Sequence, residues 1–155
     1  MKLLAISHIT KSYFNENMSI NLKSANSTDL DIVVDIDDLK RADLWKKAIA
    51  KEECFLVLDE AEIVGFVVFN YSFFGHGWLD MIEIREKSRR KGIGEKAINL
   101  VMKMCKTEKF FTSTNKSNTP MRNLLTKMDF VYSGILEGLD EGDPEIFYYK
   151  KLNPA

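Results

Sequence analysis

Cysteine and histidine are scarce in this sequence. The 155 residues include two cysteines, Cys54 and Cys105, and two histidines. The cysteines lie in separate apolar stretches without the CxxC spacing of a zinc or redox site, so we expect neither a disulfide framework nor a bound metal. Such thiols are typical of a reducing compartment, which predicts a cytoplasmic protein.

The chain also lacks an excess of charge and long hydrophobic runs. Lys and Arg total 22 against 23 Asp and Glu, a net charge of -1, so the composition predicts binding to neither nucleic acid nor a membrane surface. The apolar patch at residues 2–6 is interrupted by Ser7, His8 and Lys11, so it is too short for a signal-peptide core. No run approaches the roughly 20 apolar residues that span a bilayer. We expect a soluble protein.

Size and composition predict one globular domain. Hydrophobic residues make up 45% and charged residues 29% of the chain, which is ordinary for a folded protein of one core. We expect a single domain over residues 1–155. Its core covers residues 20–151, and residues 1–19, where no period is clear, form an N-terminal extension.

Hydrophobic periodicity predicts an α/β fold with one mixed, mostly antiparallel twisted sheet flanked by helices. Strands are predicted at residues 20–25, 54–58, 63–74, 78–84, 110–113, 130–136 and 146–149. Helices are predicted at residues 42–52, from Gly92 to Met104, and from Asn118, where Pro120 fits the first turn. The strands within residues 54–84 form a meander, and the next strand–helix–strand unit implies a parallel crossover.

Residues 27–41 give two conflicting indications. The β-branched cluster Ile32, Val33, Val34 and Ile36 favours a strand, whereas Thr28 followed by Asp31 resembles a capping box that opens a helix. We predict a helix.

A glycine-rich turn is the most informative segment. Arg89, Arg90, Lys91, Gly92, Ile93 and Gly94 follow a predicted strand and open a predicted helix. A helix N-terminus offers unpaired N–H groups and partial positive charge, and glycine lets a phosphate approach the backbone closely. A tight turn with a solvated basic edge is the alternative.

Two nucleotide-binding motifs fit less well. Gly92, Gly94 and Ala97 match a dinucleotide fingerprint, which would indicate an oxidoreductase, but the segment 111–117 lacks the acidic residue that binds the ribose. A Walker loop is excluded because no Gly-Lys-Ser/Thr is present.

The pattern Arg-x-x-Gly-x-Gly at residues 89–94, behind the strand 78–84, resembles the acetyl-CoA-binding motif of the GNAT superfamily of acyl-CoA N-acyltransferases. The element order over residues 20–151 is similar too. The resemblance implies the acyl-CoA N-acyltransferase fold and acetyl-CoA as cosubstrate. By this resemblance, the pyrophosphate of acetyl-CoA would bind the backbone N–H groups of residues 89–94, and its pantetheine arm would pair with the backbone of Ile82 and Ile84. Asn115 and Asn118 would line the far side of the cofactor.

Transfer to an amine requires a neutral nucleophile. Deprotonating an ammonium with a pKa of about 10.4 at pH 7 requires roughly 4.6 kcal/mol. We therefore expect a carboxylate or a water relay that accepts the proton. Asp80, nine residues before Arg89, matches the position where several family members carry an acidic residue proposed as the base. Glu83 is the second candidate, although a period of two points it away from Asp80 unless a bulge intervenes.

The sequence departs from the family at the helix after Asn118. Where a general-acid tyrosine is common, it has Leu125. The leaving thiolate has a reference pKa near 8.5, so an acid helps without being obligatory. Tyr132, Tyr148 or Tyr149 could substitute from a neighbouring strand, and we name Tyr132 as the candidate. Asp129 replaces the usual glycine, and Asp tolerates the left-handed conformation.

The acceptor is less determined than the cosubstrate. The acidic loop 137–145 would suit a small cationic amine, or would be only a solvated turn. We predict an N-acetyltransferase acting by direct attack in a ternary complex, with a homodimer left open. The alternatives are an acetyltransferase of protein amino groups, a non-catalytic acyl-CoA-binding or regulatory module and, third, the oxidoreductase.

Overall fold

A seven-stranded mixed sheet carries the fold. The computed structural model describes residues 19–153. Its strands are β1 (Ile20–Ser24), β2 (Cys54–Asp59), β3 (Glu62–Phe73), β4 (His76–Ile84), β5 (Lys109–Asn115), β6 (Val131–Leu136) and β7 (Glu145–Lys151). The order across the sheet is β1-β2-β3-β4-β5-β7-β6, and only β4 and β5 are parallel. The predicted mixed, mostly antiparallel sheet is confirmed.

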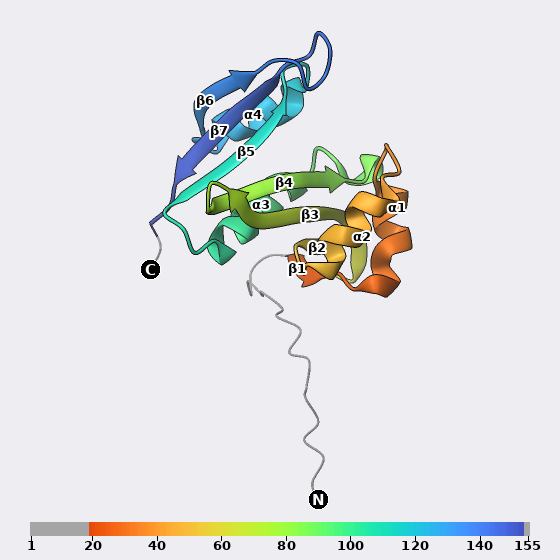
Figure 1. Ribbon diagram of the computed structural model, residues 1–155. Coiled ribbons are helices and arrows are strands. Elements are labelled where there is room, and N and C mark those ends of the chain that lie inside the picture. Colours follow the sequence, from red (N-terminus) through yellow and green to blue (C-terminus); the bar gives the residue numbers. More distant parts are fainter. Residues whose placement is uncertain (1–18, 154–155) are drawn as a thin grey trace, which may run out of the picture.

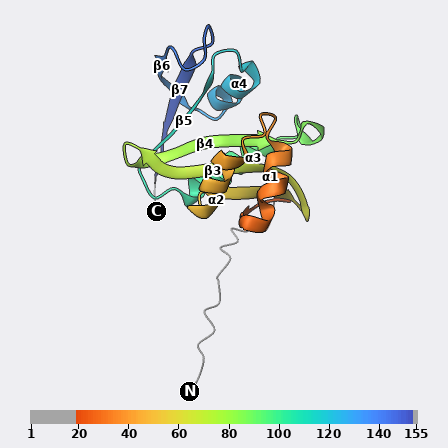
Figure 2. The same ribbon diagram turned by 45° about the vertical axis from the view of Figure 1, so that its right-hand side comes forward.

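Helices cover the two faces of this sheet unequally (Figures 1 and 2). The α-helices are α1 (Leu30–Ile36), α2 (Ala42–Ala50), α3 (Ile93–Met104) and α4 (Thr119–Lys127), and the short 3-10 helices are η1 (Ser27–Asp29) and η2 (Glu86–Ser88). We call the sheet face under α1 and α2 the front face and the face under α3 the rear face. No helix within residues 19–153 is long and apolar enough to cross a membrane.

Each face has its own buried core because successive strand residues point to opposite sides. On the front face, Trp45 of α2 packs edge-on against Phe66 of β3, with ring centroids 5.2 Å apart. On the rear face, α3 and α4 pack with Phe110 and Leu125, both fully buried. Leu125 therefore fills the core at the position where the family carries a tyrosine.

The helix predicted over residues 27–41 is confirmed for residues 27–36, whereas residues 37–41 form the turn before α2, and the cap differs from the predicted one. Asn26 caps η1 by accepting from the Thr28 N–H, while the Asp29 carboxylate accepts from the Asn26 N–H. The capping box therefore begins two residues before Thr28. Asp129 ends the α4 region at φ 62°, as expected for an Asp in place of glycine.

A β-bulge interrupts β4 at Asp80. Leu79 pairs with Phe69 and Met81 with the adjacent Val68, so β4 has one extra residue between them. Met81 belongs to the front core and Leu79 to the rear core. A bulge re-aims the side chains that follow it. The bulge therefore changes the expected alternation between Asp80 and Glu83.

A buried carboxylate fixes the turn between α1 and α2. Asp37 accepts hydrogen bonds from the Nε (3.0 Å) and Nη2 (2.8 Å) atoms of Arg41 and from the indole Nε1 of Trp45 (2.7 Å). Its Oδ1 and Oδ2 also accept the backbone N–H groups of Leu39 and Arg41. Burial raises the pKa of Asp37, but these hydrogen bonds, led by those from Arg41, outweigh it and hold the pKa well below its usual value.

Asp37→Asn should destabilise the domain by about 3 kcal/mol, because it leaves the Arg41 guanidinium and the indole N–H with a poorer partner. A lowered carboxyl pKa stabilises the fold fully above the unfolded value of about 3.9, and this contribution is lost progressively as the pH falls from that value through the much lower pKa of the folded state. Urea unfolding should therefore show the difference between wild type and variant shrinking below about pH 4.

Asp38→Asn is the matched control, since Asp38 is a neighbouring acid whose side chain is 80% exposed. It should change the free energy of unfolding by less than about 0.5 kcal/mol. Equal losses in the two variants, or a loss for Asp37→Asn that is independent of pH, would contradict the role given to the buried carboxylate.

Candidate functional site

The two parallel strands separate after a short contact. β4 and β5 pair only at Gly77 with Phe110, Trp78 with Phe111, and Leu79 with Thr112. The Thr112 hydroxyl donates to the Leu79 carbonyl over 2.9 Å at the last of these pairs. Beyond it the strands diverge (Figure 1), so the β4 residues from Asp80 to Ile84 have no β5 partner. We call this opening the fork.

The glycine-rich turn lies at the far end of β4 from the paired residues. Gly92 is the N-cap of α3 with φ 77°, and Arg90 also has a positive φ, 62°. Because Gly92 has no side chain, α3 has no side-chain cap, and the N–H groups of Gly92, Ile93 and Gly94 have no hydrogen-bond partner within residues 19–153. Arg90 and Lys91 beside them are exposed. These donors, the helix dipole and the two cations form a favourable environment for a phosphate.

The Arg89 side chain turns away from that turn. Its Nε donates to the Ile84 carbonyl over 2.7 Å, and its Nη2 lies 3.0 Å from a Glu83 carboxylate oxygen. The same Nη2 lies 3.9 Å from Asp38 of the α1–α2 turn. The sequence counts Arg89 as a third cation beside the phosphate site, whereas in the structure its guanidinium is hydrogen-bonded to β4 and lies near the exposed Asp38 of the α1–α2 turn.

Glu83 is a half-buried acid surrounded by charges of both signs. Burial raises its pKa, as do the Asp38 and Asp37 carboxylates, while Arg89 and Arg41 act in the opposite direction. The net pKa lies above the usual value for Glu. A carboxylate of this kind is a better proton acceptor than an exposed one.

Asp80 and Glu83 are brought to the same face of β4. Glu83 follows Met81 by two residues and so shares the front face with it. Both Asp80 and Glu83 raise the pKa of Arg41, behind the larger effect of Asp37. Arg41 lies on the front face, where its Cζ is 4.9 Å from the centroid of the Trp45 ring. The bulge therefore places the two candidate bases together, with Asp80 exposed at the start of the fork.

Asn115 and Asn118 have local partners on the other side of the fork. The Asn115 amide donates to the Asp140 carboxylate over 2.8 Å, which ties the end of β5 to the acidic loop. The Asn118 side chain accepts from the Met121 N–H and caps α4. Both residues therefore lie on the β5 side of the fork, and each side chain already makes a hydrogen bond within the protein.

The candidate tyrosines do not meet at the fork. Tyr132 lies on the edge strand β6, 59% exposed, with β7 and β5 between it and β4. Tyr148 is buried on the rear face, where its hydroxyl accepts a 3.3 Å hydrogen bond from Nε of Arg122. Tyr149 lies on the front face against Phe111. The geometry thus brings Tyr132 to neither Asp80 nor Glu83.

The sequence does not reveal the Asp37, Arg41 and Trp45 group. The only local indication in the sequence is the spacing of four residues between Asp37 and Arg41. That spacing is equally compatible with a buried ion pair and with a solvent-exposed one. A cavity of about 1350 Å³ also escapes prediction; it lies between the end of β1, the end of α2 and β3, and it includes Phe55 and Tyr71. None of its lining residues belongs to the fork.

Known proteins resemble this chain in sequence and in fold. Residues 19–130 match the model of the Acetyltransferase (GNAT) family. A GNAT-family acetyltransferase from Bacillus cereus is 35% identical, with 85% of this chain and 96% of that chain covered and a TM-score of 0.77. No curated protein matches.

Two more distant structures share the fold. Ard1 from Thermoplasma volcanium is 14% identical over 88% of this chain and 99% of its own, with a TM-score of 0.77. Naa50 from Arabidopsis thaliana, solved with the bisubstrate analogue CoA-Ac-MVNAL, is 15% identical over 87% of this chain and 100% of its own, with a TM-score of 0.69. The family match covers most of the chain and agrees with the fork and the uncapped helix, so the chain belongs to the GNAT family of acetyltransferases.

Proposed function

We propose that this protein is an N-acetyltransferase that moves the acetyl group of acetyl-CoA to a primary amine by direct attack within a ternary complex. The observation that carries the proposal is the fork, which joins an unpaired strand edge to an uncapped helix N-terminus. The family membership supports it, as does the CoA-containing bisubstrate analogue bound by a protein of the same fold.

The residues of the fork fit acetyl-CoA. Its pyrophosphate would be held by the N–H groups of residues 89–94, with Arg90 and Lys91 alongside. Its pantetheine arm carries amide groups, which would pair with the backbone of β4 at Ile82 and Ile84, where β4 has no β5 partner. The Ile84 carbonyl also accepts from Arg89 Nε, so it would be shared with that side chain. When bound, acetyl-CoA supplies an activated thioester, so the protein mainly has to position an amine and accept its proton.

Asp80 is our first candidate for accepting that proton. It lies at the mouth of the fork, exposed to solvent and therefore able to pass the proton on. Glu83, three residues further along the same face, is the second candidate, and its raised pKa suits a base that works near neutral pH. No tyrosine is assigned as the acid, because a thiolate with a reference pKa near 8.5 leaves without obligatory protonation.

A small cationic amine is the acceptor that the charges favour. Asp80, Glu83 and Glu145 all lie on the front face, and Asp140 joins them through Asn115. A protonated amine would be drawn to this side before it loses its proton.

Gly92→Asp should abolish acetyl-CoA binding without unfolding the domain. The new carboxylate would stand where we place the pyrophosphate, and apart from the neighbouring residues of the chain no atom lies within 4 Å of the added Cβ. The positive φ adds backbone strain at this position. The matched control is Gly75→Asp, because Gly75 has nearly the same φ, 78°, and equally open surroundings but lies in the β3–β4 turn. Acetyl-CoA should raise the melting temperature of wild type and Gly75→Asp only. An equal rise in the melting temperature of Gly92→Asp would show that the phosphate does not bind at this turn.

Asp80→Asn should lower kcat/KM about 100-fold at pH 7, within the usual range for loss of a general base. Part of the activity should return towards pH 10, where more of the amine is already neutral. The measurement is release of CoA thiol across this pH range, with Glu108→Gln as a control because Glu108 is an exposed acid in the α3–β5 connection.

The same series on Glu83→Gln distinguishes the two acids. The residue that accepts the proton shows a loss that shrinks as the pH rises, whereas one that only positions the amine shows the same loss at every pH. A loss of kcat/KM in Asp80→Asn that is the same at every pH would show that Asp80 is not the base.

A further inference from the structure

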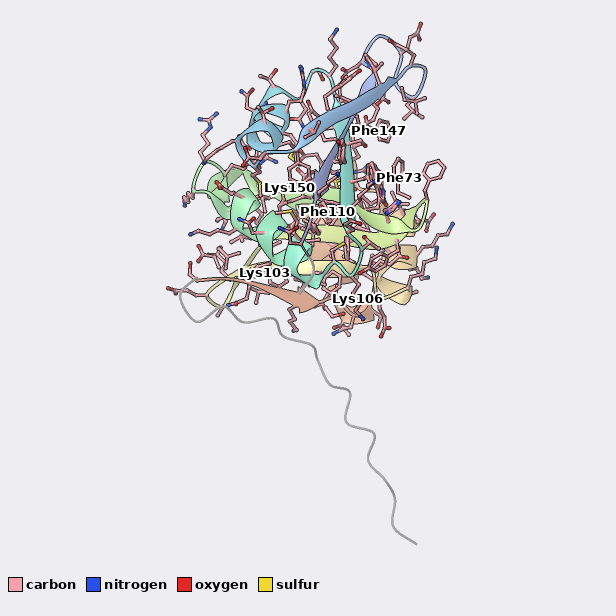
Figure 3. The ribbon with its side chains drawn as sticks, turned by 90° about the vertical axis from the view of Figure 1, so that its left-hand side faces the viewer. Phe73, Lys103, Lys106, Phe110, Phe147 and Lys150 are labelled. Carbon is pink, nitrogen blue, oxygen red and sulfur yellow. The ribbon has the colours of Figure 1, made fainter. Side chains whose placement is uncertain are left out.

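The front face carries a group of aromatic rings that no helix of the described chain covers. These rings, which we call the aromatic platform, come from four strands: Phe73, Trp78, Phe111, Phe147 and Tyr149. Figure 3 shows Phe73 and Phe147 on the side of the sheet away from α3, and Phe110 nearer the sheet centre. Each of the five is only half-buried, although large aromatic residues are normally placed where they are covered.

The platform rings lie nearly parallel to one another. Phe73 stacks on Trp78 with centroids 4.7 Å apart at 17°, and on Phe147 at 5.7 Å and 22°. Trp78 and Phe147 are 6.0 Å apart at 21°. Aromatic pairs in cores often meet edge to face as well, as Trp45 and Phe66 do. Three rings in near-parallel planes instead suit the apposition of another flat group.

The platform adjoins the fork directly. Trp78 and Phe111 face each other in the second of the three β4–β5 pairs, one residue before the strands separate. Asp80 follows Trp78 by two residues, a distance of about 7 Å along an extended strand. A molecule whose amine lies next to Asp80 could therefore place an aromatic ring on the platform if a short linker joins the two groups.

The charges near the platform have one sign at its fork end and the other at its far end. Glu145 accepts a hydrogen bond from the Ser113 hydroxyl (2.6 Å) beside Phe147, and Asp80 and Glu83 stand on the fork side. Lys109 and Lys151 lie at the opposite end, where they border a pocket with Phe111 and Tyr149. The acidic end therefore favours an ammonium group, and the rings favour an aromatic group. A molecule that carries both groups would fit this surface in one orientation.

We infer that the acceptor is a small arylalkylamine, a primary amine joined by a short linker to an aromatic ring that lies on the platform while the amine lies at Asp80. This inference rests on the proposed function and names the acceptor class for the same site. In the reaction, the ammonium loses one proton to a carboxylate, which releases it to solvent, and the neutral nitrogen forms a bond to the acetyl carbonyl carbon. As the C–S bond breaks, the CoA thiolate takes up a second proton from that nitrogen. The products are a neutral arylalkyl amide and free CoA thiol, and one proton is released to solvent.

The test compares amines that differ only in the ring. We would measure kcat/KM for 2-phenylethylamine, 2-cyclohexylethylamine and 1,4-diaminobutane, and in parallel the binding of each amine to CoA-loaded protein by saturation-transfer NMR. Wild type should prefer the phenyl over the cyclohexyl compound by about 10-fold, the upper end of what an aromatic contact adds beyond its buried area. The phenyl protons should receive the strongest saturation.

Trp78→Leu and Phe147→Leu should each bring the phenyl-to-cyclohexyl ratio close to one. Phe55→Leu is the control, because Phe55 is also a half-buried strand aromatic but packs against the rear core, on the opposite face from the platform. This variant should keep the ratio of wild type. Circular dichroism and melting temperature identify a variant that fails to fold, and the second platform variant then provides the test.

The outcomes separate the platform from the proposed reaction. Efficient transfer to diaminobutane without preference for the phenyl compound overturns the platform and leaves the N-acetyltransferase intact. No transfer to any amine, when acetyl-CoA still binds, overturns the reaction. In that case saturation of the phenyl protons that is lost in Trp78→Leu still supports an aromatic ligand on the platform, and absence of saturation in wild type overturns it.

Discussion

The early separation of β4 from β5 is the constraint on which the site depends. Parallel strands normally stay paired along their length, since unpaired backbone groups at a strand edge are costly or invite another strand. Here the pairing stops after Leu79, and the bulge at Asp80 falls at the same point. The freed edge of β4 then ends at the uncapped N-terminus of α3. The break in the sheet therefore leaves an unpaired strand edge that leads to an uncapped helix N-terminus, and the proposed acetyl-CoA site rests on this pair of features.

Arg89 connects the two sides of this site. Its backbone belongs to the glycine-rich turn, while its guanidinium is bound to the Ile84 carbonyl and the Glu83 carboxylate and lies near Asp38. The α1–α2 turn that carries Asp38 is itself held by the buried Asp37. A chain of polar contacts thus runs from the turn that would bind phosphate to the wall that faces the acceptor.

Local patterns predict much of this fold, and long-range contacts account for what they miss. The strands, α2, α3 and the uncapped turn could be predicted from hydrophobic period and glycine spacing, because those features act within one element. Residues 27–41 show a local conflict that the cap decides in favour of the helix, although the cap is Asn26 rather than Thr28. The bulge is set by how β3 and β4 pair, so no pattern within β4 alone reveals that Asp80 and Glu83 share a face.

The same distinction holds for the candidate site. Asp80 and the turn 89–94 follow from the resemblance of a continuous motif, whereas the direction of the Arg89 side chain depends on Glu83 and Asp38, which only the folded chain brings near. Tyr132 could be named only because tyrosine was absent from its usual position. The sheet order places it on the outer strand, and that order is a property of the whole topology rather than of any segment. The platform was equally hidden, since its rings come from four separate strands.

The charge on the front wall bears on how a reaction there would end. Arg41 is neutralised by the buried Asp37, so Asp80, Glu83 and Asp38 outnumber the remaining guanidinium of Arg89. A wall with excess negative charge attracts an ammonium, and the attraction is strongest for partly desolvated groups such as Glu83. Acetylation converts the cation into a neutral amide. The electrostatic part of the affinity is therefore present for the acceptor and absent for its product, so the chemistry itself weakens the contact that brought the substrate in and favours release.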